Sequence, residues 1–124
     1  MTKQKQDKAE TCQRSHCPMA CVLDLIGDRW TLLVVRDLFF GKRLFKEFQE
    51  SKERIPTNIL SDRLKRLEAA GILQKEAYQE RPVRYAYSLT DKGKDLLPVM
   101  RSLVEWSNKY IPGTIRVDAS MIKV

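Results

Sequence analysis

A series of polar side chains between residues 57 and 66 has chemistry suited to contacts with nucleic acid. Asn58 can pair with the edge of adenine, and Asp62 can accept a hydrogen bond from the amino group of cytosine. Lys65 and Arg66 carry positive charge that suits phosphates. At about 100° per residue, these groups share one side of a helix with two hydroxyl groups. The predicted contact set in this segment is Thr57, Asn58, Ser61, Asp62, Lys65 and Arg66.

The segment "IPTNILSDRLKRLEAAGIL", Ile55 to Leu73, also contains the stripe that would position these groups. Leu60, Leu64 and Leu67 fall on the opposite side at spacings typical of a helix packed on a core. Arg63 lies toward the apolar flank, where it could reach a phosphate or pair internally, and we include it among the candidate DNA contacts. The alternative is an ordinary amphipathic helix whose polar side meets only water.

A β-hairpin is predicted directly after this helix. Tyr85, Tyr87 and Leu89 alternate with polar or small residues, which is a strand period. This segment and the preceding "ILQKEAY" flank "QERP". Arg81 and Arg84 lie on either side of the proline at the predicted tip, where they could reach a minor groove or a phosphate strand. The alternative is a tip that is merely solvated.

Three further helices are predicted ahead of residue 55. They cover residues 18–26, 29–40 and 43–51, and Asp28 is the expected N-cap of the second one. Four helices, a hairpin and a last helix predict a mainly α fold with a small β-hairpin wing, that is, a winged helix-turn-helix.

The last predicted helix, residues 91–110, carries more hydrophobic surface than a small domain needs. Thr90 is its expected N-cap, and Pro98 should bend it because proline removes a backbone hydrogen bond. An exposed apolar patch of this kind is a liability unless a second copy covers it. The alternative is that the helix only covers its own core. The side chains in question are Leu96, Met100, Leu103, Val104 and Trp106.

Length and charge narrow the functional classes. The chain of 124 residues predicts one domain, residues 16–112, between a flexible N-terminal arm, 1–15, and a C-terminal tail, 113–124. A net charge of +7 favours a polyanionic partner, nucleic acid or a lipid surface, although a merely basic soluble protein is the alternative. No stretch approaches the roughly 20 apolar residues of a membrane span, and no secretory signal is present, so we expect a cytoplasmic protein without membrane contact.

The cysteines and the single histidine suggest neither a metal site nor a catalytic site. The spacing of Cys12, His16, Cys17 and Cys21 matches no zinc pattern, so no metal or cofactor is expected. Enzymatic thiol chemistry would need a fixed base and an oxyanion hole, and the sequence offers neither. A winged helix used only for protein contacts is a second rival to a DNA-binding function.

The sequence resembles the HxlR family of bacterial transcription regulators, relatives of the MarR group. The resemblance rests on "CPMACVLDLIGDRWTLLVVRDLFFGKRLFKEF", on "ILSDRLKRLEAAGIL", and on "RYAYSLTDKGKDLLPVM" followed by Trp106. It implies a sequence-specific DNA-binding regulator that acts as a homodimer on a palindromic operator. It also implies dimerisation through the first and last helices. The predicted interface residues are Val22, Leu23, Ile26, Leu96, Met100, Leu103, Val104, Trp106 and Tyr110.

The resemblance further points to Cys17 as a candidate redox or electrophile sensor. In several members of the family, the cysteine that precedes a proline at the start of the first helix has this role, and Cys17 occupies that position. A thiol at a helix N-terminus gains thiolate character from the helix dipole, and Arg14 nearby would add to it. The alternative is a purely structural cysteine.

Overall fold

The computed structural model describes residues 14–115. The predicted arm and tail, residues 1–15 and 113–124, lie largely outside the described residues, as does Cys12. Within the described part, no helix is long and apolar enough to cross a membrane. In chain order the elements are α2 (Pro18–Ile26), α3 (Thr31–Phe39), α4 (Phe45–Gln49), α5 (Thr57–Ala69), β1 (Leu73–Glu80), β2 (Val83–Leu89), α6 (Asp91–Lys94) and α7 (Leu97–Tyr110).

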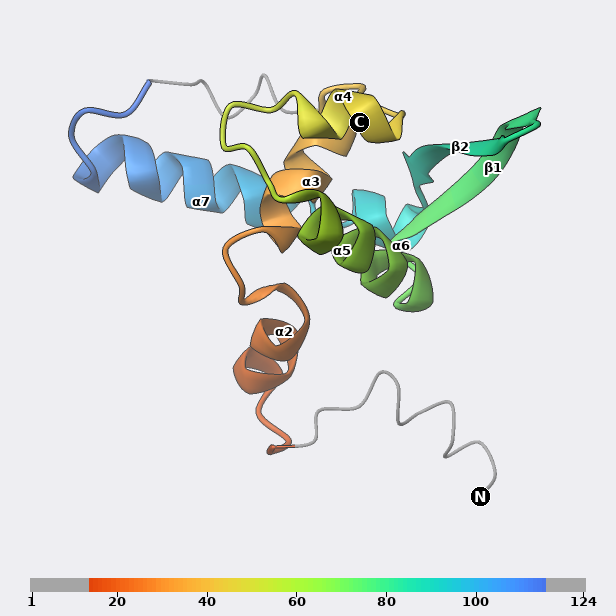
Figure 1. Ribbon diagram of the computed structural model, residues 1–124. Coiled ribbons are helices and arrows are strands. Elements are labelled where there is room, and N and C mark those ends of the chain that lie inside the picture. Colours follow the sequence, from red (N-terminus) through yellow and green to blue (C-terminus); the bar gives the residue numbers. More distant parts are fainter. Residues whose placement is uncertain (1–13, 116–124) are drawn as a thin grey trace.

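The mainly helical architecture with one antiparallel hairpin confirms the predicted fold class. In Figure 1, α3 and α5 cross at the centre, α4 lies above them, and the hairpin extends to one side. α7 extends to the other side, and α2 hangs below the body on a short loop. This arrangement gives a winged-helix body with two helices that project from it.

The hydrophobic core lies between α3, α5 and the base of the hairpin. Val35 of α3, Leu60 and Leu67 of α5 and Leu73 of β1 are almost completely buried there. α5 ends at Ala69, and Gly71 follows its C-cap with a φ of +77°, a left-handed conformation that glycine adopts without strain. The chain can therefore turn directly from α5 into β1.

The hairpin is longer and tighter than the sequence predicted, because β1 continues to Glu80 and only two residues form the turn. Leu73 pairs with Leu89 at the base, and the register shifts between Ala77 and Gln79, which is a β-bulge. A single residue before α4, Leu44, also bridges to the hairpin. The hairpin, which forms the wing, therefore contacts the rest of the domain at the residue that precedes α4.

The predicted continuous last helix is wrong. α6 ends at Lys94, and α7 begins at Leu97 with Pro98 in its first turn. Proline is tolerated there because the first amides of a helix have no partner within it. The predicted cap is confirmed, since the Thr90 hydroxyl accepts a hydrogen bond from the Gly93 amide at 3.1 Å. A side chain at Gly93 would collide with the Ile72 carbonyl, so glycine allows α6 to lie against the start of the hairpin.

Candidate nucleic-acid interface

The two faces of α5 differ as its sequence predicts. The side chains of Leu60, Leu64 and Leu67 are at most 3% exposed, so one side of α5 is fixed in the core. On the other side, Asn58 and Lys65 are exposed. Because a helix packed on one face cannot rotate without exposing its core residues, the polar face has a fixed direction. The remaining predicted contacts on this helix are Thr57, Asp62 and Arg66, which are exposed, and Ser61, which is half-buried.

The N-terminal end of α5 is tied to the helix that precedes it. The Gln49 side-chain amide of α4 donates a hydrogen bond to the Thr57 hydroxyl at 3.2 Å. The carboxylate of Glu47 accepts hydrogen bonds from the backbone amides of Arg43 and Leu44, which caps the start of α4. α4 and α5 therefore form a helix-turn-helix pair that the Gln49–Thr57 hydrogen bond joins at the end of α4.

Arg63 pairs internally, which was one of the two options predicted for it. Its Nε donates a hydrogen bond to Asp28 Oδ2 at 2.8 Å, and its Nη1 contacts Asp62. The side chain is 17% exposed. Asp28 also accepts hydrogen bonds from the backbone amides of Trp30 and Thr31, and so caps α3. One carboxylate thus connects the start of α3 with the middle of α5.

This arrangement holds the pKa of Asp28 well below its usual range. Burial disfavours the charged carboxylate, but hydrogen bonds from Thr31, Arg63 and the Trp30 amide outweigh that effect. Because the pKa is depressed in the folded protein, the stabilisation is complete above the ordinary aspartate pKa of 3.8 and is lost as the pH falls below it.

We therefore expect Asp28→Asn to destabilise the protein near neutral pH by about 1–3 kcal/mol, since it removes one partner of a charged hydrogen bond. Urea unfolding from neutral to acidic pH should show the two curves converging as Asp28 of the wild type is protonated. Asp95→Asn changes an exposed carboxylate with no ion pair within the described residues, and it is the matched control. A loss for Asp28→Asn that is independent of pH would contradict this role.

A second polar network, absent from the sequence predictions, fixes the connection into α5. Asp37 is 5% exposed and accepts hydrogen bonds from the Ser51 hydroxyl and from Arg36. Arg36 also donates two hydrogen bonds to Glu53, both 2.9 Å long, and this bidentate contact lowers the pKa of Glu53 to about 2. The network joins the end of α3 to the segment that leads into α5. Its partners are 14 and 17 residues apart in the chain, so no local spacing pattern reveals them.

Both predicted wing arginines are available for contacts. Arg81 and Arg84 are exposed, and neither forms an ion pair with any residue in the range 14–115. The Gln79 side chain donates a hydrogen bond to the Pro82 carbonyl at 3.0 Å, which steadies the tip. Arg81 lies in the turn and Arg84 one residue into β2. The wing therefore presents two arginines at its far end, next to the exposed Glu80.

Cys17 is exposed and is the N-cap residue of α2. Arg14, which was predicted to lie near this thiol and support it, donates a hydrogen bond from its guanidinium to Asp24 at 2.8 Å instead. Cys21 is half-buried, and its thiol donates to the Ser15 carbonyl. His16 is exposed. Among residues 14–115, no three His, Cys, Asp or Glu side chains lie together as a metal site would require.

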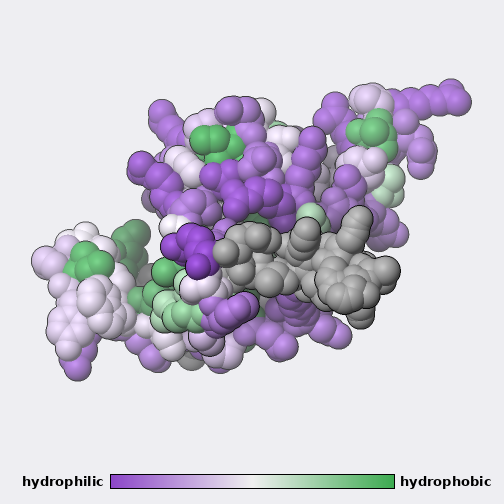
Figure 2. Space-filling view, turned by 90° about the horizontal axis from the view of Figure 1, so that it is seen from below, coloured by the Kyte–Doolittle hydropathy of each residue, from purple (hydrophilic) through white to green (hydrophobic). Residues whose placement is uncertain are grey.

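α7 has two hydrophobic faces, and within the described residues one of them packs against the core while the other does not. Met100 is 6% exposed and lies in the core, and Leu97 and Val104 pack against it. The second face remains exposed, as does part of α2. In Figure 2, apolar side chains gather toward the end that carries α7, while hydrophilic ones cover much of the remaining face. The exposed side chains are Val99, Leu103, Trp106 and Tyr110 of α7 and Met19 and Leu23 of α2.

The residues predicted to form the dimer interface differ in how exposed they are. Leu103, Trp106 and Tyr110 are 50–59% exposed, and Leu23 is 49% exposed. Ile26 and Met100 are buried within the subunit, so they support its own packing. Half-buried positions make up the remainder, namely Val22, Leu96 and Val104.

Comparisons with known proteins agree with this geometry. Residues 25–114 match the model of the HxlR-like helix-turn-helix family. The HTH-type transcriptional regulator YvaP of Bacillus subtilis is 36% identical over 100 residues, which cover 80% of this chain and 93% of YvaP.

Two solved structures extend the likeness to three dimensions. The putative transcription factor PA1607 has a TM-score of 0.73 at 37% identity, covering 85% of this chain and 74% of its own. The redox regulator HypR in its reduced form has a TM-score of 0.69 at 33% identity, covering 75% of this chain and 92% of its own. The chain belongs to the HxlR-like helix-turn-helix family and is a transcriptional regulator of this type, a class of proteins that are not enzymes.

Proposed function

We propose that the protein binds a palindromic operator as a homodimer and reads its sequence with α5. The observation that carries the proposal is the contrast on this helix: the leucines of one side are buried, while Asn58 and Lys65 of the other are exposed. An α-helix of this kind fits the major groove of DNA, which is about 12 Å wide. Acting on DNA implies a cytoplasmic location.

The residues proposed to contact DNA have different roles. Asn58 and Ser61 read base edges, and Asp62 accepts from a cytosine amino group if its contacts with Arg63 and Arg66 loosen. Lys65 and Arg66 contact phosphates. The internal pairing of Arg63 favours a positioning task for it, since its guanidinium is already bound by two carboxylates. The other proposed contacts are Thr57 on α5 and Arg81 and Arg84 on the wing.

The exposed faces of α7 and α2 support a homodimer. The rings of Trp106 and Tyr110 lie in contact in a tilted arrangement, with 5.2 Å between their centres, yet both remain more than half exposed. Such surfaces are usually covered by a partner. An interface between two copies is self-complementary and creates a twofold axis. That axis would place the two α5 helices about 34 Å apart, one turn of duplex.

Footprinting on the DNA that flanks the gene tests this function. We expect a protected site with inverted half-sites about 10 base pairs apart. Fluorescence anisotropy with that duplex should then show affinity falling with salt, at a log–log slope of about −0.9 per phosphate contacted. A winged helix used only for protein contacts would give no protected site and no salt-dependent binding to duplex.

Redox control through Cys17 is a second, narrower proposal. The exposed thiol lies at the start of α2, and the similar protein HypR is described as a redox regulator. Oxidation of Cys17 would change a helix that belongs to the proposed dimer interface, and could thereby alter operator affinity.

Treatment with diamide should therefore change the operator affinity of the wild-type protein and leave that of Cys17→Ser unchanged. Cys21→Ser is the matched control, since it removes the thiol one helical turn later and should keep the response. Identical titrations of treated wild type and treated Cys17→Ser would exclude the sensor.

A further inference from the structure

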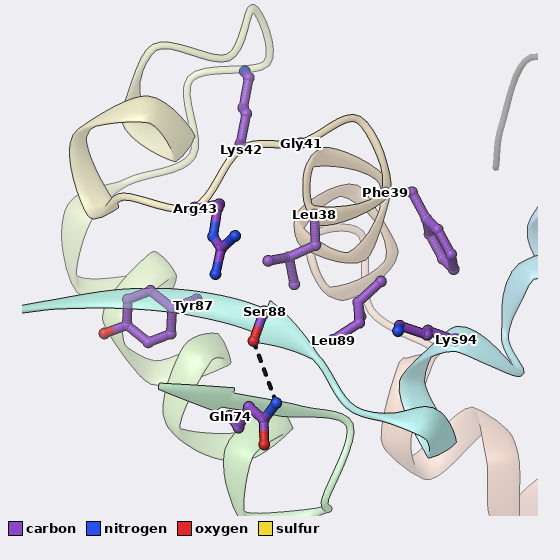
Figure 3. A pocket seen from close by; sticks show the side chains of 10 residues that line it. All are labelled: Leu38, Phe39, Gly41, Lys42, Arg43, Gln74, Tyr87, Ser88, Leu89 and Lys94. Atoms are coloured by element: carbon purple, nitrogen blue, oxygen red, sulfur yellow. Dashed lines mark hydrogen bonds between the residues drawn. The ribbon is translucent and has the colours of Figure 1, made fainter. Parts of the chain in front are cut away.

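A cavity of about 350 Å³ opens between the end of α3, the base of the hairpin and α6 (Figure 3). This volume lies within the range of small-molecule sites, about 300–1,000 Å³. Leu38 of α3 and Leu89 of β2 line it with apolar surface. Gln74 and Ser88 form a polar part of the lining and are joined by a hydrogen bond of 3.4 Å. The cavity thus combines an apolar wall with hydrogen-bonding groups.

The charge that lines this cavity is entirely positive. Arg43 and Lys94 are exposed, and neither forms an ion pair within the described part of the chain. Figure 3 shows the two side chains approaching from opposite sides, with Leu38 and Leu89 between them. No acidic side chain belongs to the lining. Two cations with no acidic partner favour an anionic ligand.

Lys42, the third cation of the lining, already interacts with other residues of the protein. Its side chain extends away from Leu38 and Leu89 in Figure 3, and Nζ lies 2.9 Å from the Ser51 hydroxyl. It belongs to the network around Asp37, at 3.9 Å from that carboxylate. The ligand-binding charge is therefore that of Arg43 and Lys94.

The polar side of the cavity does not face the proposed DNA-reading surface. Leu73 and Leu89 belong to the same hydrophobic core cluster as the buried leucines of α5, and Leu89 also borders the cavity. Gln74 and Ser88 are their neighbours along the strands and are paired with one another, so they lie on the opposite face of the hairpin. DNA bound to α5 would leave this face accessible, and contact with DNA does not account for the cavity.

We propose that this cavity binds a small organic dianion that has an apolar middle and a carboxylate at each end. The apolar part would lie against Leu38 and Leu89. One carboxylate would accept hydrogen bonds from the fork-shaped guanidinium of Arg43 and the other from the ammonium of Lys94. The ligand would touch the chain just before α4 and just before α7, and so would connect the proposed DNA-binding and dimerisation elements.

Calorimetric titration of the full chain with suberate, an eight-carbon dicarboxylate, tests this proposal. Octanoate retains one of the two charges, and octanediol retains none. We expect saturable binding of suberate in the millimolar range or tighter, weaker binding of octanoate, and none of octanediol. Because no DNA is present, the result is independent of whether the chain reads an operator.

Variants that remove one positive charge test whether suberate binds in this cavity. Arg43→Gln and Lys94→Gln should each weaken suberate binding about tenfold, as expected for a charged hydrogen bond at a partly exposed position. Lys52→Gln removes an exposed charge elsewhere and should bind suberate as the wild type does. Amide chemical shifts of the wild type should change at Gly41 and Ser88 when suberate is added.

The proposal is overturned by the absence of saturable suberate binding, by equal affinity for octanediol, or by shifts confined to α7. Equal suberate affinity in Arg43→Gln, Lys94→Gln and wild type would also overturn it. Should either variant fail to fold, the ligand series and the amide shifts of the wild type still decide the question.

Discussion

Replacement of Trp106 by glutamate is expected to convert the proposed dimer into a monomer and to remove most of the operator affinity. Trp106 is 59% exposed and lies at the middle of the uncovered face of α7. A carboxylate there would be desolvated without a partner in the proposed interface. A monomer binds only one half-site, and losing the second linked contact commonly costs a factor of about 10²–10⁴ in affinity.

Sedimentation equilibrium and operator titration measure the two effects. The mass should fall from twice the chain mass of 14.5 kDa to that mass. Lys52→Gln changes the net charge by the same single unit at an exposed loop position and should stay dimeric. A Trp106→Glu variant that remains a dimer with wild-type affinity would show that this face of α7 is not the interface.

Leu60→Ala should have the largest effect on stability, with a loss of about 2–5 kcal/mol in the free energy of unfolding. Leu60 is completely buried, and the shortened side chain leaves a cavity between α5 and the core. Total stabilities of about 5–15 kcal/mol are usual for domains, so this loss would be a large part of the whole. Operator affinity should fall as well, because α5 would lose one of the three leucines that fix its direction.

Chemical unfolding at a fixed protein concentration measures this loss, since the proposed dimerisation would make stability depend on concentration. Asn58→Ala is the matched control on the same helix, and a change at an exposed position should stay within about 0.5 kcal/mol. Equal losses for Leu60→Ala and Asn58→Ala would contradict the assignment of the two faces of α5.

Local patterns predicted α5 and the hairpin well. The 4-and-3 spacing of Leu60, Leu64 and Leu67 is a property of one helix, and the alternation of Tyr85, Tyr87 and Leu89 is a property of one strand. Burial follows from such periodicity, because each pattern already divides the element into an inner and an outer side. The sequence therefore predicts which side of α5 is exposed.

Contacts between distant segments could not be predicted in the same way. Arg63 meets Asp28 across 35 residues, and nothing in the spacing around Arg63 favours internal pairing over a phosphate contact. The network around Asp37 likewise joins residues that are far apart in the sequence. Pro98 shows a further difficulty, since one proline is compatible with a bent helix or with the first turn of a new one. The chain adopts the second arrangement, with Gly93 allowing α6 to lie against the hairpin.

The dimer prediction had a related difficulty. The hydrophobic residues of α7 cover more than one stripe, but sequence alone could not say which stripe the subunit uses itself. The structure separates Met100, which is buried, from Leu103 and Trp106, which are exposed. Substitutions that test the proposed dimer should therefore be made in the second group.

The central claim, that the exposed face of α5 reads operator bases, is tested most directly by comparing two variants on two duplexes. Asn58→Ala should reduce the preference for the footprinted operator over a scrambled duplex by about 1–3 kcal/mol. Lys65→Ala should weaken binding to both duplexes alike, because phosphates are the same in every sequence. The claim would be contradicted if both variants bound both duplexes with the affinities of the wild-type protein.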